Sequence, residues 1–225
     1  MALRPEEARV LACLVEKQVT VPDSYPLTLN SLRLACNQST NRHPVVTYDD
    51  RTVEAALISL KSQGLVRFVH PVHGRTVRYR HCADERWGLG TPELGVLAML
   101  TLRGAQTAAE VRARAERHLD GAESTVDEIL DMLAARSPEP FARRLDRRPG
   151  EREARFVSLL TDADPIDPFD GHAEVDAPRR EHGDRGDEVG IRSDPDEVAV
   201  LRAEVDELRV RLDRLEQALG ITDDA

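Results

Sequence analysis

Residues 52–60 read TVEAALISL, and residues 125–133 read TVDEILDML. In both stretches the apolar side chains recur at positions i, i+3, i+4 and i+7, which is the spacing of one face of an α-helix. These side chains are Val53, Ala56, Leu57 and Leu60 in the first stretch and Val126, Ile129, Leu130 and Leu133 in the second. The threonine, or the polar residue before it, is expected to cap each helix. The repetition indicates that one helical unit occurs twice in the chain.

Upstream of each stretch the similarity continues. Residues 10–14 read VLACL and residues 96–100 read VLAML, again with helical character. A middle helix is predicted between the echoed segments, over roughly 28–37 in the first unit and 107–119 in the second. Each unit is therefore expected to contain three helices.

A β-hairpin is predicted after the third helix of each unit. The first runs over residues 65–70 and 76–82, and the second over 141–147 and 153–160. In the first hairpin, Val66 and Phe68 alternate with Arg67, which gives one apolar and one basic face. Three helices followed by a hairpin, repeated, predict a mainly α fold with small β-hairpins (α+β), built as two winged helix-turn-helix domains over 1–88 and 89–160. The second domain is expected to begin its first helix at Thr91-Pro92.

Several short motifs in these units stand out. They are EKQ at 16–18, YPLTLN at 25–30, ACNQ at 35–38, NRHPV at 41–45, and VLAML at 96–100 followed by RGAQT at 103–107. They resemble the YceH family of bacterial proteins, and the similarity covers about residues 3–160. The resemblance implies two winged-helix domains and, by analogy of fold alone, DNA binding.

The charge is distributed unevenly along the chain. The formal net charge of the 225 residues is −10, but residues 1–160 hold 23 Lys+Arg against 21 Asp+Glu, while residues 161–225 hold 8 against 20. Residues 161–195, rich in Asp, Pro and Gly, are predicted to be a disordered acidic linker. The overall acidity therefore belongs to the C-terminal part, and it does not exclude nucleic-acid binding by the two units.

A heptad pattern follows the linker, and a coiled-coil helix is predicted over 196–220. The predicted seam is formed by Val198, Leu201, Val205, Leu208, Leu212, Leu215 and Leu219. β-Branched residues at a, here Val198 and Val205, with leucine at d favour a parallel two-stranded coil, and thus a homodimer. The alternative is a single amphipathic helix that folds back on the rest of its own chain.

Basic residues on the third helix of the first unit and on both hairpins are the candidate DNA contacts. They are Arg51, Lys61, Arg67, Arg75, Arg78 and Arg80 in the first unit, and Arg144, Arg147 and Arg148 in the second. The third helix of the second unit exposes Asp127, Glu128 and Asp131, which phosphates would repel. For the hairpins, the alternative is an ordinary solvated face of a half-buried sheet.

A polar loop follows the middle helix of the first unit and contains Asn37, Gln38, Asn41 and Arg42. Its amides and guanidinium suit a phosphate, a base edge or a protein backbone, and Arg42 also counts among the candidate DNA contacts. The alternative is that asparagine and proline have ordinary turn roles here.

No enzymatic motif, cofactor or metal site is predicted. His70, His73, His81 and Cys82 offer zinc ligands, but a hairpin centred near Gly74 places His81 opposite Val66, far from the tip. The three cysteines and the absence of a secretory signal or a membrane span favour a cytoplasmic protein. The sequence thus predicts a DNA-binding protein, with transcriptional regulation as its role. The alternative is a protein–protein interaction scaffold that binds no DNA.

Overall fold

The computed structural model describes residues 2–70, 76–120, 124–147 and 150–161, all within one compact unit. Its elements are α1 (Pro5–Thr20), η1 (Pro22–Ser24), α2 (Leu29–Cys36), α3 (Asp50–Ser62), β1 (Val66–Val69), β2 (Arg78–His81), α4 (Ala83–Trp87), α5 (Thr91–Arg103), β3 (Gln106–Thr107), α6 (Ala108–Leu119), α7 (Val126–Ala135), β4 (Ala142–Arg144) and β5 (Arg155–Ser158). The fold is α+β, with helices and small antiparallel sheets. The predicted acidic linker beyond Thr161 and the predicted coiled coil lie outside the described residues.

Two repeats of three helices and a hairpin follow one another in the described residues. The first comprises α1, α2, α3, β1 and β2, and the second α5, α6, α7, β4 and β5. Val66 pairs with His81, which is the register predicted from a hairpin centred near Gly74. The strands of the second hairpin are shorter than predicted, since only Ala142–Arg144 and Arg155–Ser158 are paired as β4 and β5.

A third short stretch of extended chain completes each sheet, and the sequence pattern did not predict it. In the first repeat the backbones of Leu27 and Tyr79 exchange hydrogen bonds of 3.1 and 2.8 Å. In the second repeat β3 pairs with β5, so that the strand order is β3-β5-β4. Immediately afterwards, Thr28 caps α2 and Thr107 caps α6 through their side chains. Both repeats thus use the same local structure to connect sheet and middle helix.

The start of α3 differs from the prediction, whereas that of α7 agrees with it. Thr125 caps α7 as expected. In α3 the cap is Asp49, whose Oδ1 accepts a hydrogen bond of 2.8 Å from the backbone N–H of Thr52. An aspartate at this position satisfies a free N–H and places negative charge at the positive end of the helix dipole. Thr52 therefore lies inside the helix rather than at its end.

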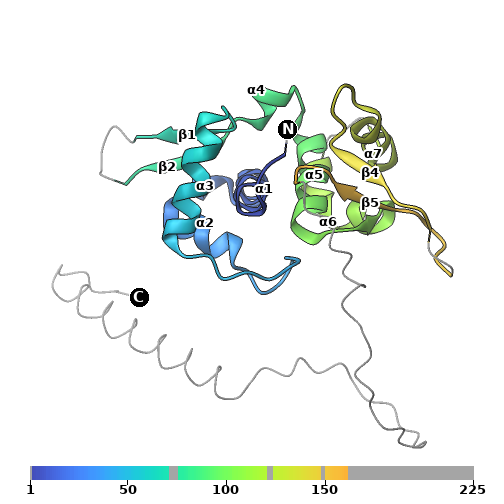
Figure 1. Ribbon diagram of the computed structural model, residues 1–225, viewed down its shortest axis with the longest axis horizontal. Helices are drawn as coiled ribbons and strands as arrows, with labels where there is room; N and C mark the ends of the chain where they lie inside the picture. Colours follow the sequence, from blue (N-terminus) through green and yellow to red (C-terminus); the bar gives the residue numbers. More distant parts are fainter. Residues whose placement is uncertain (1, 71–75, 121–123, 148–149, 162–225) are drawn as a thin grey trace, which may run out of the picture. The chain divides into compact units, whose positions relative to one another are not determined.

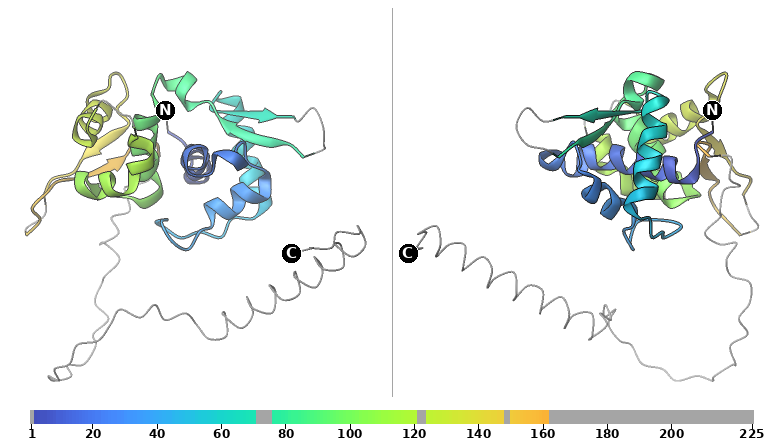
Figure 2. Two further views of the ribbon diagram at one scale, coloured as in Figure 1. Left: turned by 180° about the vertical axis from the view of Figure 1, so that it is seen from behind. Right: turned by 60° about the vertical axis from the view of Figure 1, so that its left-hand side comes forward.

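The two repeats share one hydrophobic core, centred on the contact between α1 and α5. Every residue of α1 from Glu7 to Val15 is buried, which is typical of a helix surrounded by protein. Figure 1 shows α1 between α3 on one side and α5 on the other, and leucines of both repeats belong to a single cluster. The two hairpins project from opposite sides of this core (Figure 2). None of the helices in the described part of the chain has the length and apolar character that crossing a membrane requires.

Gly95 permits the close approach of α5 and α6. A Cβ atom built on Gly95 would overlap the Cβ and Cγ atoms of His118, a residue of α6 that is only 3% exposed. Since a buried helix cannot move away without disturbing its other contacts, the position requires a residue without a side chain.

We predict that Gly95→Ala destabilises the protein by about 1–3 kcal/mol, the usual cost of overpacking a core. Helix propensity alone predicts the opposite sign, because alanine is favoured over glycine in a helix by about 1 kcal/mol. Urea unfolding followed by circular dichroism measures the change. An unchanged or increased free energy of unfolding would contradict the close packing of α5 on α6.

Candidate nucleic-acid interface

The solvent-facing side of α3 carries both charged and apolar side chains. Arg51, Ala55, Ile58 and Ser62 are exposed and follow one another at helical spacing along one stripe, and Ile58 is 64% exposed. Lys61, at the end of the helix, places its Nζ 4.4 Å from the centre of the Phe68 ring on β1. This cation–π contact connects the end of α3 to the hairpin.

The arginines of the first hairpin differ in how far their charge is neutralised. Arg67 and Arg80 both bind Glu85 of α4, at 3.2 and 2.7 Å. Arg78 instead donates hydrogen bonds to the carbonyl oxygens of Ser24 and Pro26, at 3.3 and 2.9 Å, and keeps its full charge. Arg75 lies outside the described residues. Among the described candidates of the first repeat, Arg51, Lys61 and Arg78 therefore have no carboxylate within 4.0 Å.

In the second repeat the helix and the hairpin carry opposite charge. Asp127 of α7 pairs with Arg112 at 2.7 Å, and Glu128 closes a capping box with Thr125, while Asp131 is exposed. On the hairpin and its extension, Arg144 and Arg147 are exposed and have no carboxylate within 4.0 Å in the described residues. The Arg144 guanidinium lies 5.9 Å from the centre of the Phe156 ring. Arg148 lies outside the described residues.

The asparagines of the polar loop hold the loop in place. The Asn37 side chain donates to the carbonyl of Tyr48 and accepts from its N–H, both at 2.8 Å, and so closes the segment between them. Asn41 has a φ of 63° and accepts a hydrogen bond from Arg103 of the second repeat. Gln38 is half-buried. Asn37 and Asn41 have contacts within the protein that account for their positions.

Arg42 is buried and forms an ion pair with Glu16 of α1. Its side chain is fully covered, with Nη2 at 2.6 Å and Nη1 at 3.2 Å from the two carboxylate oxygens of Glu16. Nε donates to the carbonyl of Ala35 at 3.0 Å. The guanidinium is therefore inaccessible to a phosphate, and Arg42 does not belong to an exposed nucleic-acid surface.

The Arg42–Glu16 pair also determines the protonation of the carboxyl. Burial by itself would raise the pKa of Glu16, but the hydrogen bonds and the charge of Arg42 outweigh it and hold this pKa below its ordinary value. The carboxylate therefore stays charged in the folded protein at a pH where it would be protonated in the unfolded chain.

We predict that Glu16→Gln destabilises the protein by about 3–5 kcal/mol, because it leaves the buried Arg42 guanidinium without its partner. Arg42→Met should cost less, because Glu16 keeps an ion pair with Lys17 at 3.4 Å. The matched control is Arg112→Gln, which breaks an ion pair between side chains that are 57% and 62% exposed. That control should cost less than about 1 kcal/mol. Urea unfolding at neutral pH measures all three.

The same pair has a pH signature. The pKa of Glu16 is lower in the folded protein than in the unfolded chain, so the charged carboxylate stabilises the fold at pH values above the unfolded-state pKa of about 4.5. This stabilisation is lost as the pH falls through the lower pKa of the folded state. The stability difference between the wild type and Glu16→Gln should therefore shrink below about pH 4.5. A difference that stays constant down to about pH 3 would contradict the assignment.

Sequence reasoning did not find Glu85 or the pairing of Glu16 with Arg42. Glu85 lies in α4, shortly after the basic strand β2, and the acidic pair Asp84-Glu85 beside basic residues was the one indication of this contact in the sequence. Glu16 belongs to one quoted motif and Arg42 to another, but nothing in their spacing shows that they meet. No group of three or more His, Cys, Asp or Glu residues suited to a metal ion occurs in the part of the chain that the structure describes.

Comparison with known proteins places the chain in a family. Residues 3–151 match the family described as "Protein of unknown function, DUF480". The UPF0502 protein of Leptothrix cholodnii is 43% identical over 227 residues, covering 97% of this chain and 96% of that protein. The UPF0502 proteins of Klebsiella pneumoniae and Mesorhizobium japonicum are 40% and 43% identical, over 97% and 92% of this chain and 98% and 96% of theirs. The chain therefore belongs to the DUF480 (UPF0502) family of bacterial proteins, in agreement with the resemblance of its motifs to the YceH family.

Proposed function

We propose that each repeat is a winged helix and that the protein binds double-stranded DNA through the first repeat and the two basic hairpins. In winged-helix proteins the third helix lies in the major groove and the hairpin contacts the backbone or minor groove. Here α3 and the β1–β2 hairpin are the corresponding elements, and their order after α1 and α2 supports the assignment.

The observation that carries the proposal is the exposed positive charge without a carboxylate partner on α3 and the first hairpin. Arg51, Lys61 and Arg78 are available to phosphates, whereas the charges of Arg67 and Arg80 are balanced in part by Glu85. Exposed Ala55 and Ile58 on the same helix suit contact with the methyl groups of thymine.

The second repeat contributes through its hairpin in this proposal. Asp131 and the first turn of α7 would be repelled by phosphates, but Arg144 and Arg147 are exposed on the hairpin. Because the two hairpins project from opposite sides of the core, the two repeats would contact separate stretches of DNA (Figure 2).

We predict that replacing Arg51, Lys61 and Arg78 together by glutamine weakens binding to genomic DNA fragments at least tenfold. It should also lower the slope of log K against log salt by up to about 0.9 for each phosphate that the variant no longer neutralises. Glu85→Gln should have the opposite effect and tighten binding, because it frees Arg67 and Arg80. Fluorescence anisotropy over a salt series measures both.

Arg4→Gln is the matched control, since this arginine is exposed but paired with Glu7 at the start of α1 and belongs to no element of the proposed surface. The proposal is contradicted if the wild type binds no DNA at low salt. It is also contradicted if Glu85→Gln weakens binding or the control matches the triple variant.

A protein–protein scaffold is the second candidate, favoured by the exposed apolar side chains of α2 and α3. Leu34 is 56% and Ile58 is 64% exposed. If these residues bind a protein, a pull-down with the wild type from nuclease-treated lysate will recover one stoichiometric partner. The Ile58→Ser variant will not recover it. DNA binding by the wild type would then be absent.

We also propose that the protein is a cytoplasmic homodimer without enzymatic activity, joined through Val198, Leu201, Val205, Leu208, Leu212, Leu215 and Leu219, which lie outside the described residues. A dimer would present its winged helices in symmetric pairs. A regulator that binds two repeated half-sites of DNA requires such symmetry. Deletion of residues 196–225 should halve the mass measured by light scattering. A full-length chain that is already monomeric would contradict the dimer.

A further inference from the structure

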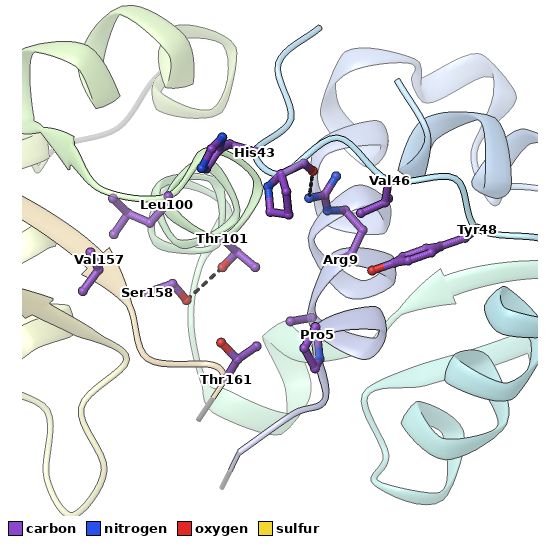
Figure 3. Close-up of a pocket in the computed structure, with 13 residues that line it drawn as sticks. Pro5, Arg9, His43, Val46, Tyr48, Leu100, Thr101, Val157, Ser158 and Thr161 are labelled. Atoms are coloured by element: carbon purple, nitrogen blue, oxygen red, sulfur yellow. Dashed lines mark hydrogen bonds between the residues drawn. The ribbon is translucent and has the colours of Figure 1, made fainter. Parts of the chain in front are cut away.

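A small cavity lies between the two repeats. Its volume is about 160 Å³, below the roughly 300–1,000 Å³ of clefts that hold drug-sized ligands. Residues of α1, of the loop before α3, of α5 and of β5 line it, so that both repeats contribute to its wall (Figure 3).

One wall of the cavity contains a buried arginine without a carboxylate partner. Arg9 is only 4% exposed, and it donates hydrogen bonds to the carbonyl oxygens of Cys36 at 3.2 Å and Pro44 at 2.6 Å. Carbonyls satisfy two of the five N–H groups of a guanidinium and none of its charge. No carboxylate lies within 4.0 Å of Arg9 among the residues that the structure describes.

The nearby charges do not compensate for this. Glu16 forms ion pairs with both Arg42 and Lys17, so its single negative charge does not compensate for Arg9 as well. Burial lowers the pKa of Arg9, and the charge of Arg42 acts in the same direction. A buried charge is costly unless it is paired, and an anion in the cavity would pair it.

The rest of the wall combines apolar surface with hydroxyl groups and the ring of His43, whose Nε2 is buried and has no hydrogen-bond partner among the described residues. Pro5, Val46, Leu100 and Val157 provide apolar surface, and Tyr48 lies on the same side as Arg9 (Figure 3). Across the cavity the hydroxyls of Thr101 and Ser158 are hydrogen-bonded to each other at 2.9 Å.

We propose that this cavity binds a small monocarboxylate with an apolar body, and that Arg9 binds its carboxylate group. Arg9 supplies one fixed positive charge, which matches a single negative charge, and the Nε2 atom of His43 is a further polar contact for the ligand. A phosphate dianion would need a second fixed positive charge. The apolar wall would cover a compact aromatic or branched aliphatic group. This site does not depend on DNA binding, because none of its lining residues belongs to the proposed nucleic-acid surface.

The test is isothermal titration of the full-length chain with benzoate and with its neutral analogue benzamide. Benzoate should bind with a Kd of about 1 mM or tighter, and at least tenfold more tightly than benzamide. The pair 3-methylbutanoate and 3-methylbutanamide repeats the comparison with an aliphatic body. Equal affinity for acid and amide in both pairs, or no binding of either acid, would overturn the proposal.

Two variants locate the site. Arg9→Gln keeps a donor for the backbone carbonyls but removes the charge, and it should weaken acid binding at least tenfold. Val46→Phe leaves Arg9 in place and fills the cavity, and it should also abolish acid binding. This variant tests whether the acid binds in the cavity even if Arg9→Gln fails to fold. Arg117→Gln, at an exposed arginine of α6 that lines neither the cavity nor the proposed nucleic-acid surface, is the control and should bind the acids as the wild type does. Unchanged affinity in Val46→Phe or in folded Arg9→Gln would overturn the assignment.

Discussion

The packing of α1 against α5 holds the other elements of the molecule in place. It buries α1 on all sides, from Glu7 to Val15, and joins the two repeats in one hydrophobic core. Apolar burial of this kind is the main favourable contribution to folding. The hairpins, the polar loop and the cavity are all positioned relative to this helix pair.

The burial of α1 explains why the arginines of the chain have different roles. Arg42 lies against this helix and is neutralised by Glu16, so it contributes to stability. The hairpin arginines are exposed or, in the case of Arg80, half-buried, and near the surface an ion pair contributes little to stability and an unpaired charge costs little. Glu85 therefore contributes little to the stability of the fold, but its charge lowers the positive potential around Arg67 and Arg80. Under the proposed function, charge balance on the hairpin sets the affinity for DNA.

Arg9 differs from both groups, because it is buried and lies beside the cavity rather than beside a carboxylate. It bridges the end of α2 and the loop before α3 through their carbonyl oxygens. The cavity wall also includes α5 and β5 of the second repeat. An anion bound there would contact both repeats and stabilise their association, since anything that binds only the folded state stabilises it.

Local patterns in the sequence were sufficient to identify the repeat, the positions of most helices and the register of the first hairpin. Hydrophobic periodicity and capping residues act over a few neighbouring positions, so that Val53 to Leu60 and Val126 to Leu133 could be assigned without a structure. The surroundings of individual polar side chains could be learned only from the folded chain. Arg42, Arg78 and Arg9 are the same residue type, but one is paired and buried, one is exposed, and one lines a cavity. Burial and partnership depend on residues far apart in the chain, such as Glu16 and Arg42, and only packing brings these together.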